Sequence, residues 1–88
     1  MAYEIEIHSS AQRSMRRLPS DVRASICDAI DGLADEPRPR GCEKVKGADR
    51  TWRIKVRRDY RVVYEVDDDG RVVRVTRVGN RSDIYRGM

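Results

Sequence analysis

Cationic side chains whose spacing suits a phosphate group lie in the second half of the chain. The stretch WRIKVRRDYR places Arg53 and Lys55 two residues apart, and Arg61 follows after a short gap. If residues 51–57 and 60–66 form two paired strands, these three side chains share one face of the sheet and lie close together. Three like charges so close repel one another unless an anion lies among them, so the pattern predicts a phosphate site. The alternative is an ordinary solvated sheet face, which also carries charged residues.

Three further residues extend the predicted phosphate site. Arg57 ends the first of the two strands, and we include it as a phosphate contact, although its position also fits a solvated side chain. Arg81 and Tyr85 follow the last predicted strand. If the chain turns back at Gly79, a guanidinium and a phenol reach the rim of the cationic face, where they suit a phosphate and a base. The alternative is that Tyr85 packs the tail onto the sheet edge.

The composition favours a polyanion as the partner. The 88 residues carry a net charge of +4, most of the 19 basic residues are arginine, and the basic excess falls in residues 45–88. The planar donor fork of arginine suits phosphate better than the point charge of lysine. The chain has no apolar run near the roughly 20 residues of a membrane span, and it lacks a signal-peptide pattern at its start. We therefore expect a cytoplasmic protein with no membrane partner.

Other features of the sequence give no indication of a metal or cofactor site. Cys27 and Cys42 are isolated and only His8, expected at the surface, could join them, so we predict reduced thiols, with Cys27 partly buried on a helix. The DDDG run at 67–70 lacks the ligand spacing of a calcium loop and predicts a turn. The glycines of 41–47 lack P-loop spacing. We expect neither metal nor cofactor.

The apolar pattern predicts the elements that must position the cationic residues. Alternation indicates strands at 3–8, 51–57, 60–66 and 71–78. Helical spacing indicates a Ser-capped helix that ends before Pro19 and a second helix from Ser20 or Asp21 to about Asp35. Residues 36–50 are predicted to form a loop. The prediction is a single α+β domain over residues 1–88: an N-terminal strand, a two-helix hairpin, then a three-stranded antiparallel meander. The helices pack on one face of a four-stranded, mostly antiparallel sheet, and the cations line the other face.

Several stretches, taken in order, resemble the RelE branch of the RelE/ParE toxin superfamily of type II toxin–antitoxin systems. They are MAYEIEIHSSAQRSMRRLP, VKGADRTWRIKVRRDYRVVYEVDDD and VTRVGNRSDIY, and together they cover nearly the whole chain. The resemblance implies an mRNA interferase that enters the ribosomal A site of the 30S subunit and cleaves mRNA there, which inhibits translation and growth. It also implies a small cognate antitoxin, with operator DNA bound only through the toxin–antitoxin complex.

The resemblance also implies roles for individual residues. The active-site positions of the family fall on Arg53, Lys55, Arg61, Arg81 and Tyr85. The expected chemistry is metal-free attack of the RNA 2′-hydroxyl on the adjacent phosphorus, with Lys55 as the base or the stabiliser of the alkoxide and Arg61 on the phosphate. Arg81 would stabilise the leaving oxygen, and Tyr85 would stack on a base. Where the best-known member has lysine, this chain has Arg53, which cannot accept a proton.

Two other functions fit the same expected fold. A ParE-like protein would inhibit DNA gyrase by binding, without RNA chemistry. A degenerate toxin would keep antitoxin and operator binding and lose catalysis. The basic cluster together with Arg81 and Tyr85 favours the RelE-like reading over the ParE-like one.

Overall fold

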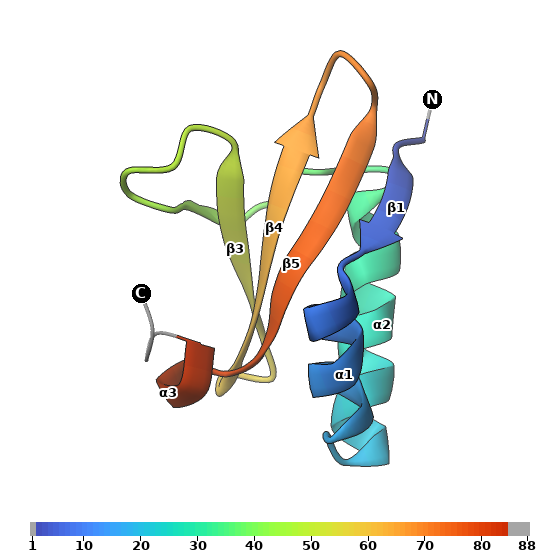
Figure 1. Ribbon diagram of the computed structural model, residues 1–88, viewed down its shortest axis with the longest axis vertical. Helices are drawn as coiled ribbons and strands as arrows, with labels where there is room; N and C mark the ends of the chain where they lie inside the picture. The colour runs from blue at the N-terminus through green and yellow to red at the C-terminus, as the bar shows by residue number, and fades with distance from the viewer. Residues whose placement is uncertain (1, 85–88) are drawn as a thin grey trace.

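The computed structural model describes residues 2–84, which fold into one layer of helices against one sheet (Figure 1). In chain order the elements are β1 (Glu4–Ile7), α1 (Ser9–Arg16), α2 (Ser20–Leu33), β2 (Glu43–Lys44), β3 (Thr51–Val56), β4 (Tyr60–Asp67), β5 (Val72–Asn80) and α3 (Arg81–Ile84). The predicted strand, helix hairpin and antiparallel meander are confirmed. No helix within residues 2–84 combines the length and apolar character needed to cross a bilayer.

The sheet has five strands rather than the four predicted. Its order is β1-β5-β4-β3-β2, with β1 parallel to β5 and the other neighbours antiparallel. The extra strand, β2, lies in the stretch predicted as a loop. It forms because the chain turns back after Val45, whose N–H donates to Thr51 O at 2.9 Å, and so brings Glu43 opposite Arg53. A strand of two residues is too short to show alternation in the sequence.

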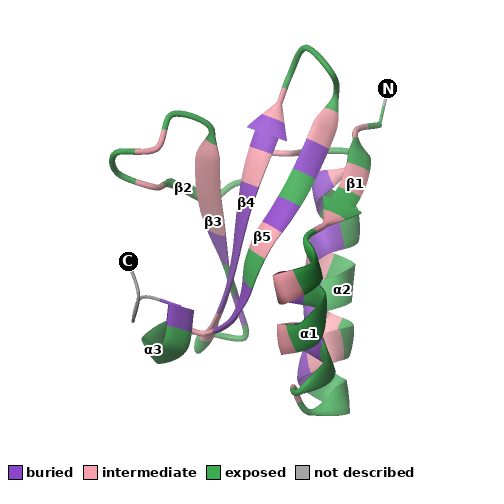
Figure 2. Ribbon diagram, in the orientation of Figure 1, coloured by how far each residue is buried: buried purple, intermediate pink, exposed green. Residues whose placement is uncertain are grey.

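The core lies between the helices and the sheet face that they cover (Figures 1 and 2). On α2 the buried residues recur at helical spacing, and they pack with alternate residues of β4 and β5. The fully or almost fully buried members of this cluster are Ala11, Ile26, Ile30, Leu33, Val62, Tyr64, Val73 and Val75. Five of these are β-branched residues, Ile26, Ile30, Val62, Val73 and Val75, so the small apolar content of the chain is concentrated in one place.

Details of the helix ends and of one cysteine differ from the predictions. The cap of α1 is His8, whose Nδ1 accepts from the N–H of Ser10 at 3.2 Å, rather than a serine. Pro19 precedes α2 and gives it no side-chain cap, since proline has no polar side chain; the helix ends at Leu33 rather than near Asp35. Cys27 is exposed, not partly buried, because it lies on the solvent side of α2 next to the buried Ile26.

The last described element lies on the other side of the sheet. Figure 1 shows α3 beside the lower ends of β3, β4 and β5, on the side of the sheet away from α1 and α2. The chain leaves β5 after Asn80, two residues beyond the predicted strand end at Val78, and the Asn80 side-chain oxygen accepts from the N–H of Ser82 at 3.0 Å. Ile84 is buried, and its side chain faces Gly79. The sheet face opposite the helices is therefore partly covered at this end.

Candidate active site

The predicted cationic residues meet on the sheet face that α1 and α2 leave open. Lys55 on β3 lies opposite Arg61 on β4, and Arg61 lies opposite Gly79 on β5. One pleat further along, Arg53 lies opposite Val63, which in turn lies opposite Arg77. Side chains alternate across a strand, so these cations share one face. We call Arg53, Lys55, Arg61 and Arg77 the basic face.

Arg77 is a member of the basic face that the sequence pattern did not single out. The pairing of β4 with β5 shifts between Val63 and Tyr64, because β5 contains one extra residue there. This bulge sends Val75 and Val78 to the same core face although they are three residues apart. Arg77 then points to the open face, where it donates to Ile84 O at 3.3 Å and holds α3 against the sheet. The odd spacing of the two valines is the signal in the sequence.

Arg61 is the buried member of the basic face. Only 7% of its surface is exposed. Its Nη1 donates to Arg58 O at 2.7 Å and to Tyr60 O at 3.0 Å, both backbone carbonyls at the β3–β4 turn. The two carbonyls accept from one nitrogen of the guanidinium and carry no net charge, and Arg61 forms no ion pair with a carboxylate within residues 2–84.

Arg53 and Lys55 differ from Arg61 in exposure and in partners. Arg53 is partly exposed and forms an ion pair with Glu43 of β2, at 3.6 Å between Nη2 and Oε2. The unpredicted strand β2 is what brings this carboxylate beside it. Lys55 is exposed and makes no ion pair with the residues that the structure describes. Lys55 is therefore more open to a ligand in solution than Arg53 or Arg61.

Arg81 begins α3 beside the same turn. Its backbone N–H donates to Asp59 O at 2.8 Å, and its side chain is exposed. This contact places the backbone of residue 81 beside the β3–β4 turn, and the role of the Arg81 side chain at the rim of the basic face stays a prediction. Tyr85, the other predicted rim residue, lies outside the described residues.

The β3–β4 turn, residues 57–59, holds an unusual backbone. Arg57 and Arg58 have φ angles of 50° and 65°, in the left-handed region that side chains disfavour by about 1–2 kcal/mol per residue. The turn is closed by the Asp59 N–H, which donates to Arg57 O at 2.6 Å. Residues kept in this region persist only where surrounding contacts fix them.

Arg57 leaves the basic face and reaches the helix layer. Its Nη1 donates to Asp21 Oδ2 at 2.8 Å and its Nε to Ser25 Oγ at 2.9 Å, both on α2. The hydrogen bond from Arg57 is the main cause that lowers the pKa of Asp21 below its ordinary value. Of the residues predicted to contact phosphate, Arg57 is thus the one that the structure does not bring together with the others.

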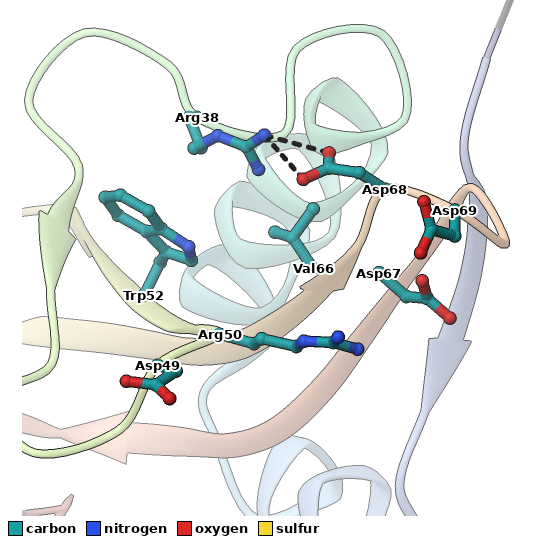
Figure 3. Close-up of a pocket in the computed structure, with 8 residues that line it drawn as sticks. All are labelled: Arg38, Asp49, Arg50, Trp52, Val66, Asp67, Asp68 and Asp69. Atoms are coloured by element: carbon teal, nitrogen blue, oxygen red, sulfur yellow. Dashed lines mark hydrogen bonds and ion pairs between the residues drawn. The ribbon is translucent and has the colours of Figure 1, made fainter.

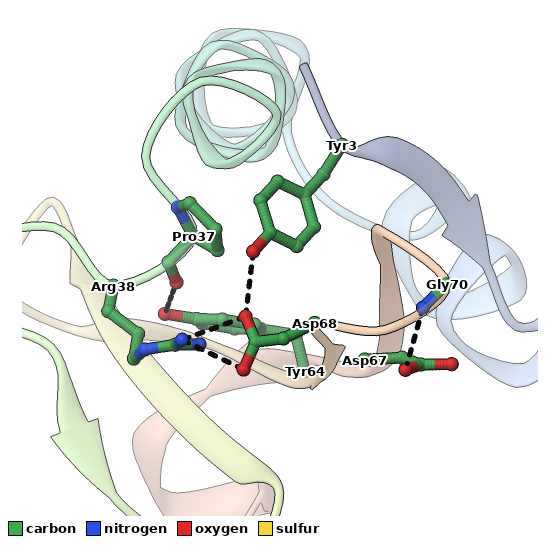
Figure 4. Close-up of polar contacts among 7 residues, drawn as sticks. All are labelled: Tyr3, Pro37, Arg38, Tyr64, Asp67, Asp68 and Gly70. Carbon is green, nitrogen blue, oxygen red and sulfur yellow. Dashed lines mark hydrogen bonds and ion pairs between the residues drawn. The ribbon is translucent and has the colours of Figure 1, made fainter. Parts of the chain in front are cut away.

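A polar pocket lies at the end of the sheet opposite to the β3–β4 turn (Figure 3). Its lining includes Arg38, Arg50, Trp52 and the acidic residues of the 67–70 turn. There Asp68 accepts two hydrogen bonds from Arg38, at 2.8 and 3.0 Å, and a third from the Tyr3 hydroxyl at 2.7 Å (Figure 4). The bonds from Tyr3 and Arg38 lower the pKa of Asp68. Arg38 and Asp68, two of the charged residues that line this pocket, are therefore already paired with each other.

Comparison with known proteins gives the class of this fold and site. Residues 5–85 match the family described as "ParE toxin of type II toxin-antitoxin system, parDE". The chain is 31% identical over 87 residues to Toxin RelG of Mycobacterium tuberculosis, covering 98% of this chain and 99% of RelG. It is 34% identical over 88 residues to the mRNA interferase toxin RelE of Escherichia coli, covering 97% of this chain and 92% of that one.

Solved structures agree with these relatives. The toxin chain in the crystal structure of the intact E. coli RelBE toxin-antitoxin complex superposes with a TM-score of 0.79 at 32% identity, covering 90% of this chain and 96% of that chain. The chain belongs to the RelE/ParE superfamily of toxins from type II toxin–antitoxin systems. Within the superfamily it is a RelE-type toxin, as the ordered sequence stretches indicated.

Proposed function

We propose that this toxin is a ribosome-dependent endoribonuclease that cleaves mRNA in the ribosomal A site and so inhibits translation and growth. The observation that carries the proposal is the meeting of Lys55, Arg61 and Arg81 around one turn, on a face whose charge is not fully neutralised by residues 2–84. The name of the E. coli relative, mRNA interferase, supports the same reaction class.

The proposed reaction uses the nucleophile that RNA already carries. The 2′-oxygen attacks the adjacent phosphorus, the bond from phosphorus to the 5′-oxygen breaks, and the products are a 2′,3′-cyclic phosphate and a free 5′-hydroxyl. A proton leaves the 2′-hydroxyl and a proton reaches the departing oxygen, so the step is balanced without a cofactor. The protein has to stabilise the extra negative charge on the phosphorane-like transition state.

Each cation takes a role that fits its position. Lys55, exposed and opposite Arg61, takes the 2′-hydroxyl proton or stabilises the developing alkoxide. Arg61 holds the scissile phosphate, since a charge fixed in a poorly hydrated site acts more strongly on a nearby anion than a charge in water. Arg53 binds a neighbouring phosphate, for which it exchanges Glu43.

The rim supplies the remaining roles. Arg81, exposed at the start of α3, stabilises the leaving 5′-oxygen. Tyr85 stacks on a base and helps to splay the RNA backbone for in-line attack; this role rests on the family resemblance alone. With no histidine or carboxylate in the set, the intrinsic chemistry is weak, and the ribosome supplies the orientation of the RNA.

The matching partner is a small antitoxin. The E. coli relative was crystallised as an intact RelBE toxin-antitoxin complex. We expect the cognate antitoxin to cover the basic face, because acidic or backbone groups laid over Arg53, Lys55 and Arg61 would block RNA. Co-expression with the antitoxin should restore growth, and operator DNA should be bound by the complex and not by the toxin alone.

The decisive experiment incubates purified toxin with mRNA-programmed ribosomes and with the same RNA free in solution, and maps new 5′ ends. We expect cleavage in the A-site codon on ribosomes and little on free RNA. Tyr85→Phe should retain more activity than Tyr85→Ala, since it keeps the ring.

A parallel supercoiling assay with DNA gyrase tests the ParE-like alternative that the matched family description raises. Gyrase inhibition without RNA cleavage would replace the proposal; neither activity would indicate a degenerate toxin.

A further inference from the structure

One three-residue turn connects both arginines that we place at the scissile phosphate. The Arg61 guanidinium is bonded to Arg58 O, and the Arg81 N–H is bonded to Asp59 O. These two carbonyls belong to neighbouring residues of the β3–β4 turn. Any change in the backbone of the turn therefore displaces the anchor points of Arg61 and Arg81 at the same time.

The residue types in the turn do not favour its backbone conformation. Its two left-handed residues are Arg57 and Arg58, with φ angles of 50° and 65°, where glycine or asparagine would be favoured. A different turn backbone would point Arg58 O in another direction and take it away from Arg61. Contacts from outside the turn must therefore fix this conformation.

The contacts that fix the turn from the helix layer come from α2. Arg57 is held by Asp21 at 2.8 Å and by Ser25 at 2.9 Å. Asp21 lies in the first turn of α2 and Ser25 lies one turn further along, so both present a rigid surface to the guanidinium. The two bonds tie the first left-handed residue of the turn to the helix that packs on the far face of the sheet.

We propose that the Asp21–Arg57 ion pair is a positioning device for catalysis: it fixes the β3–β4 turn, whose carbonyls orient Arg61 and Arg81 toward the RNA. The inference rests on the proposed ribonuclease function. Asp21 and Arg57 are positioning residues, since they touch the turn and not the substrate. Removal of the negative charge of Asp21 should slightly favour RNA binding by electrostatics. On this proposal the same change lowers the rate of cleavage, because the turn is no longer fixed.

The test compares Asp21→Ala, Arg57→Ala and the double variant in cleavage of A-site mRNA. We expect turnover in each single variant to fall about 10- to 100-fold, because small displacements of catalytic groups have effects of this size, with the KM for programmed ribosomes unchanged. The double variant should be no slower than the worse single one, since both remove the same contact. Asp21→Asn, which keeps the shape of the side chain, should lie between wild type and Asp21→Ala.

Two matched variants control for charge and backbone. Arg71→Ala removes an exposed arginine that is also left-handed, with φ 55°, in the turn at the other end of the sheet. Asp31→Ala removes an exposed acid from the same helix. Both should retain the wild-type rate. Equal loss in the controls would show a general effect of charge or folding and would overturn the proposal.

A readout without RNA separates this inference from the proposed function. In ¹⁵N-labelled toxin, the Nη1 protons of Arg61, held by two carbonyls, should give resolved, slowly exchanging signals. Asp21→Ala and Arg57→Ala should broaden these signals while the thermal transition remains cooperative. Unchanged Arg61 signals in both variants would end the proposal. Full turnover in Asp21→Ala, with loss of both activity and salt dependence in Arg57→Ala, would also end it and would make Arg57 an RNA contact. Wild-type toxin that cleaves nothing would sink the proposed function, whereas the NMR outcome would still decide whether the ion pair fixes Arg61.

Discussion

Arg38 and Arg61, at opposite ends of the sheet, are held by partners of different charge. At one end Arg38 is bonded twice to the Asp68 carboxylate, which also accepts from Tyr3, and its guanidinium lies 5.7 Å from the centre of the Trp52 ring. At the other end Arg61 is bonded to two backbone carbonyls. A carboxylate cancels the charge of a guanidinium, whereas carbonyls orient it and leave the charge in place. This contrast is the reason that we place the proposed RNA site at the end of the sheet that holds Arg61.

The largest expected effect is the loss of that charge at the turn end. Arg61→Ala and Arg81→Ala should each lower single-turnover cleavage of ribosome-bound mRNA by about 100-fold or more, since each removes charge stabilisation at the transition state. Arg38→Ala, at the paired end, should cleave at the wild-type rate. Arg61→Lys should rescue little, because one ammonium cannot reproduce the planar fork between two carbonyls. Near wild-type cleavage by folded Arg61→Ala protein would erase the contrast between the two ends.

The paired end should instead show its importance in stability. Tyr64 is fully buried, and its hydroxyl donates to Pro37 O at 2.7 Å; burial raises the pKa of this hydroxyl. Tyr64→Phe removes the donor and should lower the free energy of unfolding by about 1–2 kcal/mol, with cleavage by the folded protein unchanged. Urea unfolding measures the first quantity and the ribosome assay the second. A stable variant with impaired cleavage would mean that the two ends are coupled.

A smaller effect is expected in the salt dependence of binding. Each phosphate contact on single-stranded RNA contributes roughly −0.7 to the slope of log affinity against log salt. Between 50 and 200 mM salt, the fall in the affinity of Lys55→Ala for RNA should therefore be smaller than that of wild type by a factor of about two to three. Lys44→Ala, an exposed lysine on the neighbouring strand β2, is the control. Identical slopes in all three proteins would return Lys55 to the role of a solvated residue.

The smallest effect concerns acid stability at the paired end. The pKa of Asp68 is lowered in the folded protein, chiefly by the hydrogen bond from Tyr3 and then by Arg38. Its ionised form therefore stabilises the fold above the unfolded pKa of about 4, and this contribution is lost as the pH falls through the lower folded value. Asp68→Asn should lower the melting temperature slightly at pH 7, and the difference from wild type should vanish in strong acid. A constant offset between Asp68→Asn and wild type at all pH values would argue against linkage to the ionisation of Asp68.

The alternation of residues in the sequence predicted the meander and the grouping of Arg53, Lys55 and Arg61, because period 2 and pairing along the chain are local properties. Partners distant in sequence were not predictable in the same way. The parallel pairing of β1 with β5 and the two-residue strand β2 depend on contacts between segments with no shared pattern.

The position of Arg57 could not be predicted for a different reason. Its left-handed backbone turns the side chain away from the face that alternation assigns to it, and the run Arg57-Arg58-Asp59 contains no glycine or asparagine to signal such a turn. The burial of Arg61 also escaped prediction, since its partners are backbone carbonyls, which every residue carries.

The central place of β5 has a consequence for synthesis of the toxin. This strand lies between β1 and β4, yet it is the last strand to be made, and Glu4 pairs with Val72 across most of the chain. A nascent or truncated product that stops before residue 72 lacks the strand that joins β1 to the β3–β4 hairpin. Such a fragment exposes two unpaired sheet edges and much of its core, which favours removal by cellular proteases. The sheet is therefore complete only when the strand leading to Arg81 has been made.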